Sequence, residues 1–276
     1  MRFAKYHALG NDYIVLDPQD AGDELPPHVV RRICDRHYGV GSDGILLGPI
    51  GEGRPLRLRI YNPDGSEAEK SGNGLRIFAR YLLDTGRAGQ GPIDIVTSGG
   101  PVRAEVLAGG DVRVEMGTVS FQSGCIPVSG PPREVVDEEM TVAGERLRYC
   151  AATIGNPHCV ILNAAVTPEI ARRLGPAIET DPRFPNRTNV QFLAVLDRRT
   201  IRIEVHERGA GYTLASGSSS VAAAATAVRL GLCDRQVTVR MPGGELTVTL
   251  SADFAATLQG PVTKIADGTI DPQCLA

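Results

Sequence analysis

The chain has 276 residues, a formal net charge of −3 and 42% hydrophobic residues, a composition typical of a folded protein in water. This length exceeds one ordinary core of about 100–150 residues, so we expect two domains. The charge balance gives no basic excess for nucleic acid, and the longest apolar runs are far too short for a membrane span, so we expect neither partner.

Alternating or β-branched segments predict strands along most of the chain. The predicted strands cover 1–8, 13–16, 44–47, 56–61, 93–97, 102–106, 111–115, 149–153, 158–162, 189–195, 200–206, 236–240, 245–250 and 256–259. Helical spacing and start signals predict helices over 27–38, 72–83, 168–178 and 217–232. Many strands joined by hairpin-like turns indicate an α+β protein with mainly antiparallel sheets.

An internal repeat is the most informative pattern. SGNGLRIFARYLLDTG from Ser71 is followed by IDIVTSGG and a hairpin, and SGSSSVAAAATAVRLG from Ser216 is followed by VTVRMPGG and a hairpin. We therefore predict two pseudo-symmetric domains, each a sheet around a central helix. The predicted domains are residues 1–117, joined by a returning strand over 262–276, and residues 118–261.

Six cysteines are present, and none forms a C-x-x-C pair. The start, MRFAKYHALGND, lacks the apolar core of a signal peptide, so we expect a cytoplasmic protein with reduced thiols. Cys159 follows His158 on a predicted strand and would face the opposite side, which favours a core thiol. Asp12 and Asp43 belong to no cluster with ligand spacing, so no metal is expected.

The repeated Ser-Gly turns suggest a binding site. A single such turn before a helix is usually no more than a cap. If two similar halves face each other, however, both helix N-termini point into a shared cleft, where their N–H groups and dipoles would favour a carboxylate. Ser71 and Ser216 would then lie on opposite sides of that anion.

The chain resembles the diaminopimelate epimerase family over nearly its whole length. The resemblance is carried by HALGNDY at 7–13, GVGSDG at 39–44, YNPDGSEAEKSGNG at 61–74, GNPHCV at 155–160, FPNRTNV at 184–190 and HERGAGYTLASGS at 206–218. It implies the diaminopimelate epimerase-like fold, with the active site in a cleft between two domains. It also implies inversion of an amino-acid α-carbon without a cofactor, as in conversion of LL- to meso-diaminopimelate for lysine and peptidoglycan precursors.

The resemblance also implies roles for individual residues. Asn11 matches an asparagine near the reacting centre, and the helix starts match the residues whose amides hold the α-carboxylate: Gly72, Asn73, Gly217 and Ser218. The residues implied for the distal amino-acid group are Asn62, Asn156, Asn189 and Arg208. His158 and Glu207 match the groups that tune the catalytic thiols, and Glu207 also counts among the substrate-binding residues.

The two catalytic cysteines of the family are replaced. Where the family has A-x-C-G-N-G and A-C-G-[ST]-G, this chain has Ser71 and Ser216 at the cysteine positions. A thiol at a helix N-terminus converts readily between thiol and thiolate near neutral pH, whereas a serine hydroxyl needs an adjacent base. We therefore assign the catalytic positions to Ser71 and Ser216, with Glu207 and His158 as the activating groups.

Three interpretations of the serines stay open: an engineered pair that traps substrate, a natural paralogue in which the serines act with help, and an amino-acid-binding pseudoenzyme. Tyr212, Ser219 and Ile77 also depart from the usual family residues, which favours natural divergence. Elimination or isomerisation of another amino acid is an alternative activity. The expected partner is a small amino acid. The family often forms dimers, so a homodimer is an expected assembly, although no apolar strip in the sequence points to one.

Overall fold

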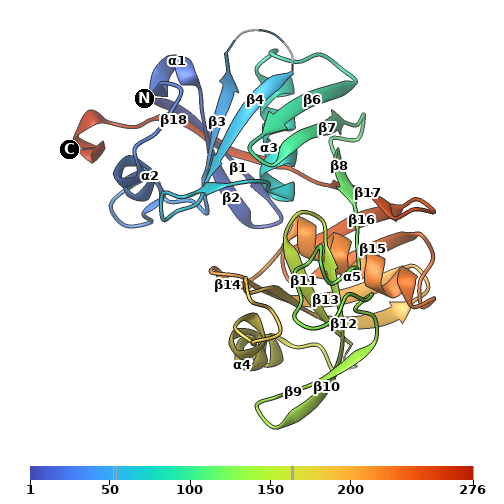
Figure 1. Cartoon of the computed structure of the whole chain (residues 1–276). Coiled ribbons are helices and arrows are strands. Elements are labelled where there is room, and N and C mark those ends of the chain that lie inside the picture. Colours follow the sequence, from blue (N-terminus) through green and yellow to red (C-terminus); the bar gives the residue numbers. More distant parts are fainter. Residues whose placement is uncertain (52, 54, 163–164, 276) are drawn as a thin grey trace. The chain divides into compact units, whose positions relative to one another are not determined.

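The computed structural model describes the whole chain except residues 52, 54, 163, 164 and 276. It divides into two compact units: Met1–Glu115 together with Gln259–Ala276, and Met116–Leu258. The first unit is therefore built from both ends of the sequence, and the C-terminal strand, red in Figure 1, lies among its blue strands. Among the described residues, no helix is both long and apolar enough to cross a membrane.

The first unit is a mixed sheet with helices on it. Its elements are β1 (Arg2–Ala8), β2 (Asn11–Leu16), α1 (Pro18–Ala21), α2 (Pro27–Cys34), β3 (Ile45–Ile50), β4 (Leu56–Tyr61), β5 (Glu67–Ala68), α3 (Gly72–Asp84), β6 (Pro92–Thr97), β7 (Gly100–Val106), β8 (Val112–Thr118), β18 (Thr263–Thr269) and a 3-10 turn (Pro272–Leu275). The strands pair in the order β18-β1-β2-β3-β4-β6-β7-β8, and only β2–β3 and β4–β6 are parallel. Helix α3 packs against β1, β2 and β7, and most of its residues are buried.

The second unit repeats this plan. Its elements are β9 (Glu138–Val142), β10 (Glu145–Thr153), β11 (Pro157–Leu162), α4 (Pro168–Glu179), β12 (Asn189–Asp197), β13 (Thr200–Glu207), β14 (Gly211–Thr213), α5 (Gly217–Arg229), β15 (Gln236–Met241), β16 (Gly244–Leu250) and β17 (Ala255–Gly260). The order β9-β10-β11-β12-β13-β15-β16 again has two parallel pairs, β11–β12 and β13–β15. Short strands β5 and β14 occupy matching places, each paired with the strand that precedes it in the chain. The predicted α+β fold with two related halves is confirmed.

Each unit has its own apolar core. In the first unit, α2 shares a core cluster with β2 and β3, and in the second, α4 packs against β12 and β13 over a cluster that also includes residues of β10 and β11. The periodicity of α2 and α4 explains this arrangement, because apolar side chains recur on one face of each helix. The predicted core position of Cys159 is confirmed, since it lies fully buried in the second cluster.

Some element bounds differ from the sequence expectation. The helix expected over 27–38 ends at Cys34, because Asp35 leaves the helical conformation and its carboxylate accepts the N–H groups of His37 and Tyr38, both at 2.7 Å. The helix expected over 217–232 ends at Arg229, two residues before Gly231, whose φ of 73° lies in the left-handed region that commonly ends a helix. Strand β18 covers Thr263–Thr269 instead of 262–276, and residue 276 lies outside the described residues.

Candidate active site

The two serines singled out by the sequence occupy equivalent places. Ser71 precedes α3 with an extended backbone, and its hydroxyl oxygen accepts the N–H of Gly74 at 3.0 Å. Ser216 precedes α5 in the same conformation, and its hydroxyl oxygen accepts the N–H of Ser219 at 3.4 Å. Both helices have 13 residues. Each serine is thus an N-cap, and the first N–H groups of each helix have no acceptor within the helix itself.

The repeated Gly-Gly turns hold the segments that lead into these serines. The N–H of Gly99 donates to the carbonyl of Glu69 at 3.0 Å, and the N–H of Gly243 donates to the carbonyl of Leu214 at 2.9 Å. Glu69 and Leu214 each lie at the second position before the capping serine. A Cβ on Gly99 would lie 2.6 Å from the carbonyl oxygen of Glu69, so this approach requires glycine. The same main-chain link therefore positions the cap in both units.

Tyr13 contacts the first of these serines. Its hydroxyl lies 3.1 Å from the Ser71 hydroxyl, and its side chain, on β2, is buried. The ring passes directly beside Gly44, where a Cβ would lie 2.6 Å from the Tyr13 ring and from the carbonyl of Tyr61. Burial lowers the pKa of Lys70, the residue before Ser71. Sequence reasoning did not single out Tyr13 or Gly44, although both lie within motifs that carry the family resemblance.

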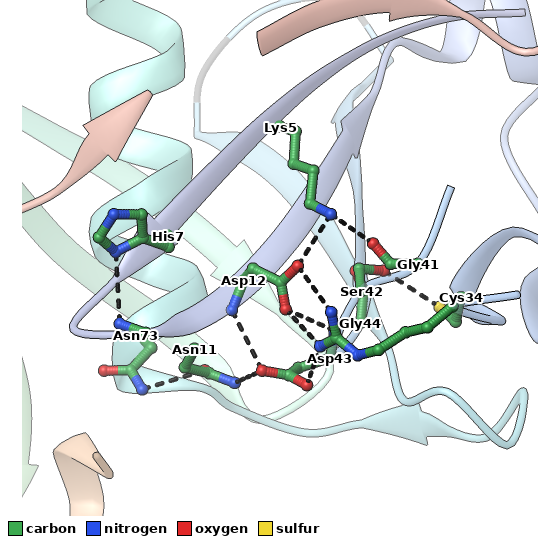
Figure 2. Close-up of polar contacts among 12 residues, drawn as sticks. Lys5, His7, Asn11, Asp12, Cys34, Gly41, Ser42, Asp43, Gly44 and Asn73 are labelled. Atoms are coloured by element: carbon green, nitrogen blue, oxygen red, sulfur yellow. Dashed lines mark hydrogen bonds and ion pairs between the residues drawn. The ribbon is translucent and has the colours of Figure 1, made fainter. Parts of the chain in front are cut away.

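Asn11 and Asn73 are linked by their side chains, as Figure 2 shows. The Asn73 amide donates to Asn11 at 3.0 Å, and the Asn11 amide donates to the carboxylate of Asp43 at 3.0 Å. Arg76, one turn into α3 and fully buried, donates to the Asn73 side-chain oxygen at 2.8 Å and to the carbonyl of Gly72 at 3.2 Å. These contacts fix which way both amides point.

A group of charged side chains that includes Lys5, Asp12 and Asp43 lies beside Asn11 (Figure 2). Asp12 accepts bonds from Arg36 at 2.7 Å and lies 3.0 Å from the ammonium of Lys5, and Arg36 also bonds Asp43 at 2.7 Å. Burial alone would raise the pKa of Asp12, but the bonds from Arg36 and Lys5 outweigh it and hold the pKa below its ordinary value. This group is paired within itself and supports the turn that carries Asn11. Among the described residues, no group of three His, Cys, Asp or Glu side chains is arranged to hold a metal ion.

His158 and Asn156 lie together in the second unit. The Nε2 atom of His158 lies 3.0 Å from the Asn156 side-chain oxygen, and the Asn156 amide approaches the Ser218 hydroxyl at 3.5 Å. Complete burial lowers the pKa of His158 to about 3, so its imidazole is neutral at physiological pH. Gln191, which sequence reasoning missed, donates to the Ser219 hydroxyl at 2.9 Å beneath the start of α5.

Asn189 and Arg208 form a second pair. The Asn189 side-chain oxygen accepts the backbone N–H of Arg208 at 3.0 Å, and its amide donates to the carbonyl of Pro157 at 2.9 Å. The Arg208 guanidinium is exposed and donates to the carbonyl of Asn186. Glu207 lies beside it, and one of its carboxylate oxygens is 3.4 Å from the Thr213 hydroxyl. The guanidinium therefore has a side open to solvent.

The turn after Glu207 is anchored by Glu179 at the end of α4. This buried carboxylate accepts the N–H of Gly209 at 2.9 Å and lies 2.8 Å from Nε2 of His206, and it also pairs with Arg187. Burial alone would raise the pKa of Glu179, but these hydrogen bonds and the nearby Arg187 lower it overall. A carboxylate only accepts hydrogen bonds, so Nε2 of His206 carries the proton between them.

Two other residues singled out from the sequence, Asn62 and Tyr212, make their hydrogen bonds outside the clusters described above. The Asn62 amide donates to the Ser66 hydroxyl at 3.0 Å within its own turn, apart from the Asn11–Asn73 pair. Tyr212 donates its hydroxyl to the buried carboxylate of Glu204 at 2.7 Å, and burial with this bond raises the pKa of Tyr212 to about 12.

The sequence is similar over most of its length to proteins of one family. A sequence model described as diaminopimelate epimerase matches residues 3–122 and 150–265. Diaminopimelate epimerase 2 of Nostoc sp. is 56% identical over 278 residues, covering 100% of this chain and 98% of the relative. Diaminopimelate epimerase of Moorella thermoacetica is 40% identical, covering 97% of this chain and 98% of the relative.

Solved structures share the fold at low sequence identity. A hydroxyproline epimerase from Agrobacterium vitis matches with a TM-score of 0.72 at 16% identity, over 100% of this chain and 94% of that one. A phenazine biosynthesis protein from Bacillus anthracis matches with a TM-score of 0.67 at 15% identity, over 97% of this chain and 98% of that one.

The repeated α+β units and the matched relatives define the protein as an isomerase of the epimerase type. Both the family model and full-length relatives above 30% identity point to one group within this class. The chain belongs to the diaminopimelate epimerase family.

Proposed function

We propose that this protein inverts one α-carbon of diaminopimelate without a cofactor, using Ser71 and Ser216 at the proton-transfer positions. The observation that carries the proposal is the pair of equivalent N-caps, each serine at the start of a 13-residue helix, in a chain 56% identical to a diaminopimelate epimerase. One hydroxyl would return a proton to the α-carbon, and the other would receive one.

The substrate α-carboxylate is assigned to the helix starts. The N–H groups at the beginning of α3 and α5 carry the positive ends of the helix dipoles, which stabilise an anion. The backbone of Gly72, Asn73, Gly217 and Ser218 supplies these groups. The Asn73 side chain is committed to Asn11 and Arg76, so it is not the part assigned to substrate.

The distal amino-acid group is assigned to Asn62, Asn156, Asn189 and Arg208. The exposed guanidinium of Arg208 suits a carboxylate, which it can bind through two parallel hydrogen bonds. Asn189 contributes by holding the Arg208 backbone. We therefore expect a substrate with charged groups at both ends.

Glu207 and His158 are assigned to assist Ser216. Burial lowers the pKa of His158 to about 3, so its imidazole is neutral and a weak base that can accept a hydrogen bond from a hydroxyl. Its Nδ1 atom is buried and has no hydrogen-bond partner among the described residues. Glu207 supplies a carboxylate at the end of β13, 3.4 Å from the hydroxyl of Thr213 on β14, the strand that comes before α5 in the chain. These two residues are the candidates for activating an otherwise weakly acidic hydroxyl.

The test is incubation with LL-diaminopimelate in deuterated water, followed by nuclear magnetic resonance of the α-proton and chromatography of the stereoisomers. We expect α-deuterium incorporation and meso product. The matched comparison is the double variant Ser71→Cys with Ser216→Cys, which restores thiols at both positions. A wild-type chain that gives neither exchange nor product, beside an active double variant, would reject catalysis by the serines.

A second candidate, a non-catalytic binding protein, is favoured by the surroundings of Ser216. Within the described part of the chain, the hydrogen-bond partner of its hydroxyl is the N–H of Ser219, at the long distance of 3.4 Å. Calorimetry with LL- and meso-diaminopimelate separates the candidates, because tight binding without α-proton exchange would identify a binding protein.

A further inference from the structure

The two capping serines differ in one respect. The hydroxyl of Ser71 lies 3.1 Å from the phenol of Tyr13, whereas the hydroxyl of Ser216 is bonded to a main-chain N–H. A phenol is far more acidic than an aliphatic hydroxyl, with an ordinary pKa of about 10. The first unit therefore places an acidic hydroxyl directly against a serine that has been assigned to proton transfer.

The hydrogen-bond capacity of Ser71 restricts what this pair can do. A hydroxyl oxygen has one proton to donate and two lone pairs to accept with. The N–H of Gly74 uses one lone pair at 3.0 Å. If Tyr13 donates to the second lone pair, the proton of Ser71 is left for another acceptor. If Ser71 donates to Tyr13 instead, one lone pair is left to receive a proton.

The position of Tyr13 is built into the sheet. Its strand, β2, pairs in parallel with β3, and the N–H of Ile14 donates to the carbonyl of Gly44 at 3.1 Å. The missing side chain at Gly44 leaves the space that the Tyr13 ring fills, since a Cβ would lie 2.6 Å from the ring. The Tyr13 side chain is buried in this space, so its phenol has little freedom to move away from Ser71.

From this geometry we infer that Tyr13 is a positioning residue that relays a proton to and from Ser71. The inference rests on the proposed function and deepens it. When the pair delivers a proton, the Ser71 O–H bond breaks as a C–H bond forms at the substrate α-carbon, and the phenol proton moves to the Ser71 oxygen, leaving a phenolate.

Proton removal is the reverse. The α-proton moves to the Ser71 oxygen, the proton of Ser71 moves to the Tyr13 phenolate, and the electron pair of the broken C–H bond stays on the α-carbon. The negative charge on the enzyme therefore rests on a phenolate and not on an alkoxide. This explains how serine can serve at a position where the family has cysteine, whose thiolate carries the charge alone.

The test compares Tyr13→Phe in two backgrounds, the natural Ser71 chain and Ser71→Cys. We expect Tyr13→Phe to lower kcat about 100-fold in the Ser71 chain, within the range typical of a lost proton-transfer partner, with KM little changed. In the Ser71→Cys chain the same substitution is expected to have a much smaller effect on kcat, because a thiolate needs no phenol. Exchange of the α-proton in deuterated water gives the rates.

Tyr6→Phe is the matched control. Tyr6 is a buried tyrosine of the neighbouring strand β1, and its hydroxyl donates to Asp84 at 3.0 Å, away from Ser71. Tyr6→Phe removes one hydroxyl hydrogen bond outside the site, so kcat should stay at the wild-type value. Thermal unfolding of each variant confirms that it is folded.

Three results would overturn the inference. An undiminished kcat in Tyr13→Phe means that the phenol transfers no proton, and an equal loss in both backgrounds means that it only packs. A wild-type chain without exchange, beside an active double cysteine variant, rejects the proposed function together with the relay. An active wild-type chain with either of the first two results rejects the relay alone.

Discussion

Glu179 provides the sharpest test of how the second unit holds its substrate-binding turn. Its carboxylate joins the end of α4 to His206 on β13 and to the N–H of Gly209, in the turn that follows Glu207 and Arg208. The residue is only 5% exposed, so the charge depends on these partners. Glu179→Gln removes the charge while keeping the size of the side chain.

The expected magnitude follows from the bonds that change. A hydrogen bond to a charged group contributes about 1.5–3 kcal/mol, and the glutamine amide turns one acceptor into a donor that faces another donor. We expect Glu179→Gln to lower the free energy of unfolding by about 3–5 kcal/mol, the usual range for a broken buried pair. For a chain of this length that corresponds to a fall in Tm of roughly 10 °C. The ion pair between Arg187 and Glu179 contributes little to this free energy, because the Arg187 side chain is 52% exposed.

The assay is urea unfolding of wild type and variant as a function of pH. Because the pKa of Glu179 is lowered by folding, its contribution is present above the ordinary value of 4.5 and is lost as pH falls through the lower folded-state pKa. The difference in the free energy of unfolding between wild type and Glu179→Gln should therefore be largest at pH 7 and should shrink below pH 4.5.

Glu145→Gln is the control for Glu179→Gln. Glu145 pairs with Arg173 in the same unit, but its side chain is 44% exposed, so its loss should change the stability little. KM for diaminopimelate should rise only in Glu179→Gln, because only that variant releases the turn carrying Arg208. Equal stability of the two variants, or a pH-independent difference, would refute the reasoning.

Two further predictions concern one residue in each unit. Asp43→Asn removes the carboxylate that accepts from Asn11, and calorimetry should show diaminopimelate binding weakened about tenfold, the equivalent of one hydrogen bond; unchanged affinity would remove Asn11 from the binding set. Cys159→Ser buries a hydroxyl in an apolar core where burial already raises the pKa of the thiol, so urea unfolding should show a loss of about 1–3 kcal/mol while kcat persists. Loss of kcat in a folded Cys159→Ser chain would give that thiol a catalytic role instead.

Much of the architecture could be predicted because its signals are local. The Ser-Gly steps and helical spacing predicted α3 and α5 from their first residues, and the repeat predicted that the two units share one plan. Strand β9 was missed because EEMTV shows a charged start and only two buried positions, Met140 and Val142. It becomes a strand through pairing with β10.

The contacts that support the candidate site could not be predicted in the same way. Tyr13 reaches Ser71 across 58 positions of sequence, and His206 reaches Glu179 across 27. Such pairs depend on which strands lie side by side, for which the sequence carries no periodic signal. Arg76 reads as one polar residue in an apolar helix, and only the fold shows that its burial serves Asn73.

The links from Gly99 and Gly243 have an evolutionary consequence. Each fixes the approach to a capping residue through main-chain atoms, so the location of that residue is independent of its side chain. A duplicated ancestor could then exchange the reactive atom in one half, and recruit a neighbour such as Tyr13 to suit it, without disturbing the other half. The reactive side chain at each capping position can therefore change separately, because the main-chain links that position it do not involve that side chain.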